Sequence, residues 1–121
     1  LGGVQKLLDR LDHVMTNSAA GMVGAWTGEL SPSETLRRNF WFCAIDDPSA
    51  LRVRDRIGVE HILLETDYPH ADSTWPDCQL LLRDRLAGIP APEVDLVTHL
   101  NAARLFDHPL PPAGWTERPG A

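Results

Sequence analysis

Two short apolar segments decide the fold class: FWFCAI at residues 40–45 and HILLET at residues 61–66. Both are short, apolar and almost without polar alternation, which is typical of strands buried on both faces of a parallel sheet. Residues 48–57 between them predict a helix that is capped by Asp47 and ended by Gly58. Strand, helix and strand in this order form a βαβ unit, whose strands are parallel in nearly all known cases. The sequence therefore predicts an α/β fold.

Further helices are expected on both sides of this unit. The best marked one begins at Ser31, which forms a capping box with Glu34, and runs to about Arg38. The remaining predictions are helices over residues 4–16, 74–88 and 93–106, a glycine-rich loop over 17–29, a stiff proline linker over 89–92 and a loose proline-rich tail over 108–121. At 121 residues, we expect one domain, over residues 1–107.

The predicted sheet is incomplete. Trp41 and Cys43 lie in the middle of the first strand, so we expect them in the core. Three or more strands are normally needed for independent stability, and two apolar strands would leave both outer edges open for pairing. The pattern therefore predicts a piece of a larger α/β sheet or barrel.

Composition narrows the partners and the compartment. The chain has 11 Lys and Arg against 17 Asp and Glu, a net charge of −6, without a basic run. This balance argues against nucleic acid or an anionic membrane as partner, so we expect the partner to be a small-molecule substrate. No apolar stretch approaches the roughly 20 residues of a membrane span. Two cysteines without Cys-x-x-Cys spacing and no visible signal peptide favour the cytoplasm, and the first residue, Leu1, is typical of a processed or truncated chain.

Polar residues gather after both strands. Asp46 and Asp47 follow the first, and residues 65–76, with Glu65, Asp67 and His70, follow the second. In parallel α/β folds such positions face the active site. Simpler roles remain open: Asp67 can be a turn former, Asp47 a helix cap, and His70 a solvated loop residue.

Other sources of chemistry are weak. His61 begins its strand about 20 Å from Asp67, so the two cannot share a site. The sequence has no glycine-rich phosphate loop and no Gly-x-Ser-x-Gly elbow. A zinc site needs three or four ligands, and Asp67 with His70 offers two at most.

The segment LLETDYPHADSTWP, residues 63–76, resembles the last-strand motif of the amidohydrolase-related family. These are metal-dependent TIM-barrel enzymes that include decarboxylases resembling aminocarboxymuconate-semialdehyde decarboxylase. The resemblance covers roughly residues 1–107: residues 2–12 are similar to the helix after the sixth strand, 31–47 to the approach to the seventh strand and that strand, and 101–106 to the closing helix.

The resemblance implies the C-terminal part of a (β/α)8 TIM barrel, containing its last two strands. Asp67 then corresponds to the eighth-strand aspartate, a catalytic residue and metal ligand that exchanges protons with a metal-bound water or the substrate. His70 and Tyr68 become substrate-binding residues, and the cofactor is a divalent metal ion, expected to be zinc. Glu65 is added to the substrate-binding residues because strand alternation puts it on the same inward face as Asp67. The family's other ligands, a His-x-His pair after the first strand and histidines on middle strands, are not in this sequence.

Several functions stay open at this point. The leading expectation is a hydrolase that acts through a metal-activated water, and a metal-dependent decarboxylase is the alternative within the family. A non-catalytic folding or interaction module and a half-barrel that completes its site by self-association through its strand edges are the rivals. Glu65 stands where the family often has a small residue, so its role is either direct or limited to packing or a local salt bridge.

Overall fold

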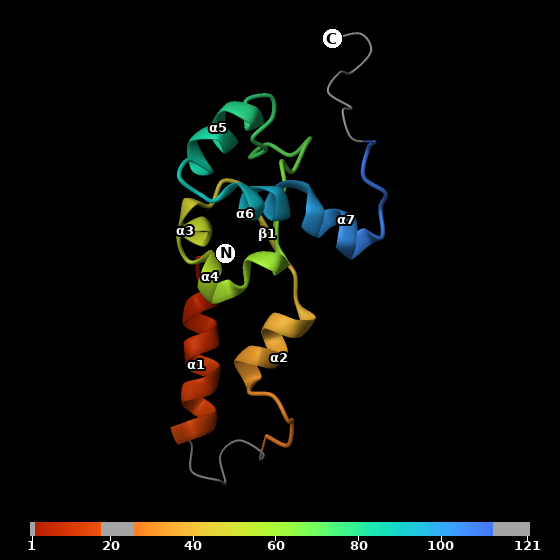
Figure 1. The fold of residues 1–121 in the computed structure, drawn as a ribbon. Helices are drawn as coiled ribbons and strands as arrows, with labels where there is room; N and C mark the ends of the chain where they lie inside the picture. The colour runs from red at the N-terminus through yellow and green to blue at the C-terminus, as the bar shows by residue number, and fades with distance from the viewer. Residues whose placement is uncertain (1, 18–25, 113–121) are drawn as a thin grey trace.

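The computed structural model describes residues 2–17 and 26–112. Its strands, β1 (Phe42–Ala44) and β2 (Ile62–Leu64), pair in parallel, with Phe42 opposite Ile62 and Ala44 opposite Leu64 (Figure 1). The fold is therefore α/β, and the prediction that segments 40–45 and 61–66 are parallel neighbours is confirmed.

Both strands are shorter than predicted at both ends, and neighbouring elements take their first residues. The backbone N–H of Phe40 caps the preceding helix by donating to the carbonyl of Leu36. Residues 59–61 form a 3₁₀ turn, which places His61 just before β2. There the His61 ring stacks on Trp41 at 4.6 Å, and its Nδ1 lies 2.9 Å from the carbonyl of Phe40. His61 is thus at the amino end of the strands, away from Asp67, as predicted.

The connection between the strands is two short helices, α3 (Pro48–Arg52) and α4 (Arg54–Ile57), where one helix over 48–57 was expected. The break falls at Val53, whose φ of −115° and ψ of 19° are not helical. The predicted cap is confirmed, since the Asp47 carboxylate accepts a hydrogen bond from the N–H of Ala50 at 3.1 Å. Gly58, with a φ of 104°, ends α4.

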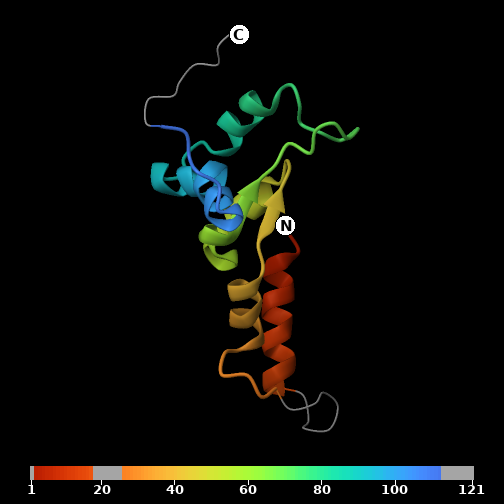
Figure 2. The ribbon, with the colours of Figure 1, turned by 90° about the vertical axis from the view of Figure 1, so that its right-hand side faces the viewer.

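Two helices precede the sheet. Helix α1 (Val4–Asn17) matches its prediction, and α2 (Pro32–Asn39) begins at the predicted capping box. The Ser31 hydroxyl accepts from the N–H of Glu34, and the Glu34 carboxylate accepts from the N–H of Ser31 at 2.8 Å. Figures 1 and 2 show α1 and α2 side by side, extending away from the sheet. The predicted loop over 17–29 lies largely outside the described residues.

The C-terminal helices differ from their predictions at their ends. Helix α5 (Cys78–Arg85) is shorter than the expected 74–88. Helix α6 (Ala91–Asp95) includes part of the expected linker, because Pro92 lies in the first helical turn, where proline is tolerated. A π-helical turn (Leu96–Leu100) and α7 (Asn101–Phe106) complete the last helix. Residues 108–112 form neither helix nor strand.

The core lies on one side of the sheet. Ile57, Ile62 and Val97 are buried together, and Figure 2 shows α6 and α7 on this side of the strands. Ala44 is buried, whereas Cys43, whose side chain alternates to the other face, is exposed. The expectation that both faces are buried is therefore wrong at Cys43, although Leu63, its partner on the same face of β2, is buried. Trp41 is only half-buried.

None of the helices in the described ranges is long and apolar enough to cross a membrane.

Candidate active site

The loop after β2 is closed at its base by hydrogen bonds to one carbonyl. The carbonyl of Thr66 accepts from the N–H of Thr74 at 3.2 Å and from the hydroxyl of Ser73 at 2.6 Å. The Ser73 hydroxyl in turn accepts from the N–H of Trp75 at 3.1 Å. The loop therefore leaves the sheet and returns at a fixed point, which holds the residues between in a defined turn.

Asp67 is the first residue inside this closed loop. Its backbone has a φ of 54°, a left-handed conformation that aspartate tolerates better than most residues. Its carbonyl accepts from the N–H of His70 at 2.9 Å, and its carboxylate Oδ2 lies 2.8 Å from His70 Nδ1. Backbone and side chain therefore both join Asp67 to His70.

This pair has a defined chemistry. An ionised carboxylate can only accept, so Nδ1 of His70 carries the proton of the hydrogen bond. The Asp67 side chain is 31% exposed and that of His70 is 72% exposed. The second carboxylate oxygen and Nε2 of His70 have no hydrogen-bond partner in the part of the chain that the structure describes. Asp67 can therefore accept a proton from a molecule at the mouth of the loop.

Tyr68, which we expected to contact the substrate, lies on the same loop and packs against Trp75. Its ring packs edge to face with Trp75, with the ring centres 5.8 Å apart and the planes at 67°. Both rings remain more than half exposed. They form an aromatic surface beside the Asp67–His70 pair.

Glu65 lies apart from Asp67. It directly follows β2, and its N–H donates to the carbonyl of Ala44 at 3.1 Å. Its carboxylate is near Cys43: burial, and then the negative charge of Glu65, raise the pKa of the Cys43 thiol. The structure thus places Glu65 on the face of the sheet that bears Cys43.

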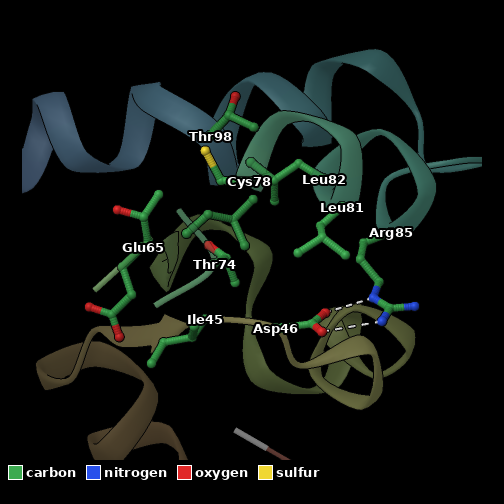
Figure 3. A pocket seen from close by; sticks show the side chains of 11 residues that line it. Ile45, Asp46, Glu65, Thr74, Cys78, Leu81, Leu82, Arg85 and Thr98 are labelled. Carbon is green, nitrogen blue, oxygen red and sulfur yellow. Dashed lines mark hydrogen bonds and ion pairs between the residues drawn. The ribbon is translucent and has the colours of Figure 1, made fainter. Parts of the chain in front are cut away.

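A cavity of about 390 Å³ lies where the two strands end beneath α5 (Figure 3). Glu65 lies at one side and Asp46 at the other, and α5 contributes Leu81, Leu82 and Arg85. Asp67, Tyr68 and His70 do not line it. The predicted site residues therefore fall into two groups, the loop group and Glu65 at the cavity.

Asp46, the other carboxylate that follows a strand, is already paired. It accepts from Arg85 Nε at 2.7 Å and from Arg85 Nη2 at 3.3 Å (Figure 3). These hydrogen bonds hold the pKa of the Asp46 carboxyl below its usual range. Sequence reasoning missed Arg85, since an arginine in the last turn of a surface helix does not reveal a partner 39 residues away.

The described residues alone do not make a metal site. They contain no group of three or more His, Cys, Asp or Glu side chains that could hold an ion. Asp67 and His70 offer two potential metal ligands, which are hydrogen-bonded to each other, and a zinc site takes three or four protein ligands. Any metal at Asp67 therefore needs ligands from other parts of the protein.

Comparison with known proteins identifies the family. The family model described as amidohydrolase matches residues 5–108, a range that contains both strands, the Asp67 loop and the last helix. No match was found among curated proteins. The family match spans most of the chain, and the chain belongs to the amidohydrolase family.

Proposed function

We propose that this chain is the C-terminal part of a metal-dependent hydrolase in which Asp67 moves the proton. The observation that carries the proposal is the position of Asp67, directly past the carboxyl end of a parallel strand and hydrogen-bonded to His70 at 2.8 Å. Active sites of parallel α/β folds are found at this edge. Membership of the amidohydrolase family supports hydrolysis as the reaction.

The architecture we propose is the last two strands of a (β/α)8 TIM barrel. Three features support it: the strands are parallel, α6 and α7 lie on one side of them, and Cys43, on the other side, is exposed. In a closed barrel the helices form an outer ring and the opposite face of each strand points into a packed interior. Cys43 lies on the face that such an interior would bury.

A divalent ion, zinc by expectation, would lower the pKa of a bound water and so supply a nucleophile. The donor set here is incomplete, so the contribution of this chain is limited to its own residues. Asp67 provides a carboxylate that can bind the metal ion and accept a proton. We propose Tyr68 and Glu65 as contacts of a small-molecule substrate. The alternative to hydrolysis is metal-dependent decarboxylation, which an assay of carbon dioxide release would detect.

The test is Asp67→Asn in the complete protein, assayed on amides, esters and lactones with carbon dioxide release measured in parallel. We expect kcat to fall about 10²- to 10⁴-fold, the usual contribution of a positioned proton-transfer group, while folding stays unchanged. Asp72→Asn is the matched control, because Asp72 is an exposed carboxylate of the same loop. Activity of Asp67→Asn within a few-fold of wild type would make Asp67 a turn former only.

A further inference from the structure

We infer that His70 is a positioning residue that fixes the orientation of the Asp67 carboxylate, in place of the substrate contact that the sequence suggests. The inference rests on the proposed function and deepens it. It assigns the two ring nitrogens different roles: Nδ1 holds Asp67, and Nε2 is not required.

Backbone hydrogen bonds of the loop place His70 beside Asp67. The N–H of His70 donates to the carbonyl of Asp67 at 2.9 Å, and the carbonyl of His70 accepts from the N–H of Ser73 at 3.1 Å. Ser73 is itself tied to Thr66 at the base of the loop by its hydroxyl at 2.6 Å. A short hydrogen-bonded loop therefore holds the ring of His70 next to Asp67.

Asp67 has few other restraints. Its side chain is 31% exposed, and His70 is its one side-chain hydrogen-bond partner in the described ranges. Its left-handed backbone, with a φ of 54°, belongs to the turn. Without the bond from His70, the carboxylate would spread over several staggered rotamers. A reacting carboxylate must be held to about 0.5 Å, so this one bond decides how often Asp67 is in place.

The hydrogen bond also fixes which oxygen stays available. Oδ2 receives the proton of His70 Nδ1, which leaves the other carboxylate oxygen to face a water or substrate. Partners that orient a reacting or ligating group typically contribute a factor of about 10–100 in activity or affinity. The same range is expected here.

Asparagine and glutamine separate the two ring nitrogens. The amide of asparagine can place its N–H₂ near the position of Nδ1, whereas that of glutamine reaches the position of Nε2. In the complete protein we therefore compare His70→Ala, His70→Asn and His70→Gln, with Asp72→Asn as control. We expect kcat of His70→Ala to fall about 10- to 100-fold with KM little changed, and His70→Asn, but not His70→Gln, to restore it.

A second readout does not depend on activity. The χ1 populations of Asp67, measured by NMR couplings, should be narrow in wild type and His70→Asn and broad in His70→Ala and His70→Gln. Restoration by His70→Gln alone, a rise in KM at unchanged kcat, or a narrow χ1 distribution in His70→Ala would each overturn the inference. The two proposals fail separately: an active Asp67→Asn rejects the proposed function, whereas an inactive Asp67→Asn with a fully active His70→Ala rejects only the role of His70.

Discussion

The side-chain amide of Asn101 donates a 2.7 Å hydrogen bond to the backbone carbonyl of Ile62, the first residue of β2. The same Nδ2 donates to the carbonyl of Val59 at 2.8 Å. The backbone N–H and C=O groups of successive residues in a strand point to alternate edges of that strand. The N–H of Glu65 points toward β1, so the carbonyl of Ile62, three residues earlier, points to the opposite edge of β2. One buried side chain therefore joins the last helix to the strand that leads to Asp67.

Removing this amide should destabilise the protein. Asn101→Ala would leave the carbonyl of Ile62 without its donor inside the core, where Asn101 is 1% exposed, whereas the carbonyl of Val59 keeps the hydrogen bond from the N–H of Ile62. One stranded buried acceptor costs about 1–3 kcal/mol, so we expect a loss of roughly 1–3 kcal/mol in the free energy of unfolding. Urea unfolding measures it. Asn17→Ala is the control: the Asn17 amide bonds only to His13 within α1, at an exposed helix end, so its loss should change stability by less than that of Asn101. Equal effects of the two substitutions would contradict the role of Asn101.

The pair Asp46–Arg85 predicts a pH effect. Hydrogen bonds from Arg85 lower the pKa of Asp46 in the folded state, so the pair stabilises the fold above the unfolded pKa and is lost as the pH falls through the folded one. Arg85→Gln should return the pKa of Asp46 toward its ordinary value, as read by carboxyl NMR titration. The effect on stability should be small and salt-sensitive, because both side chains are more than a third exposed.

The control for this titration is Arg83→Gln, on the same helix. Arg83 has no hydrogen-bonded partner in the described part of the chain, so its loss should leave the Asp46 titration in place. An Asp46 titration that is unchanged in Arg85→Gln would show that the pair does not persist in solution.

Cys43 tests the proposed barrel. Its thiol is exposed here on a face that a closed barrel would bury. Iodoacetamide should therefore label Cys43 in the 121-residue chain and leave it protected in the complete native protein, with urea-unfolded protein as the control. The reaction is run at alkaline pH, because burial and the charge of Glu65 raise the pKa of this thiol. Equal labelling of the chain and the complete protein would argue against the barrel.

Local signals carried most of what the sequence predicts correctly. The capping box of Ser31 and Glu34, the cap at Asp47 and the stop at Gly58 are all decided within a few residues, and all are in the structure. The parallel pairing also follows from local pattern, because a short βαβ connection leaves little choice of direction.

Relations between distant segments could not be predicted. The pairing of Asp46 with Arg85 and of Asn101 with Ile62 each spans 39 residues, and nothing in either sequence neighbourhood indicates the partner. Exposure of Cys43 depends on what covers the sheet, which the apolar run FWFCAI cannot tell. Within the loop, spacing suggested that Asp67 and His70 are close, but not that Nδ1 is the atom that joins them.

The 121-residue chain on its own should hold no metal tightly and catalyse nothing. Asp67 and His70 are two potential metal ligands that the loop brings together, and the described residues contain no group of three such ligands. The sheet has two strands, and large apolar side chains such as Phe40 and Phe106 are more than half exposed. A sheet of this size with open edges should be partly molten and prone to associate.

Calorimetric titration of the chain with zinc should therefore give weak, non-stoichiometric heat that Asp67→Asn does not alter. A hydrophobic dye should bind strongly, because exposed aromatic side chains are accessible in a loosely packed state. Size-exclusion chromatography with metal analysis adds the oligomeric state, where a metal-containing dimer would support a half-barrel completed by self-association. One tight equivalent of metal on a compact monomer, lost in Asp67→Asn, would show that two strands and one loop suffice for the site, because nothing else in that sample could supply the missing ligands.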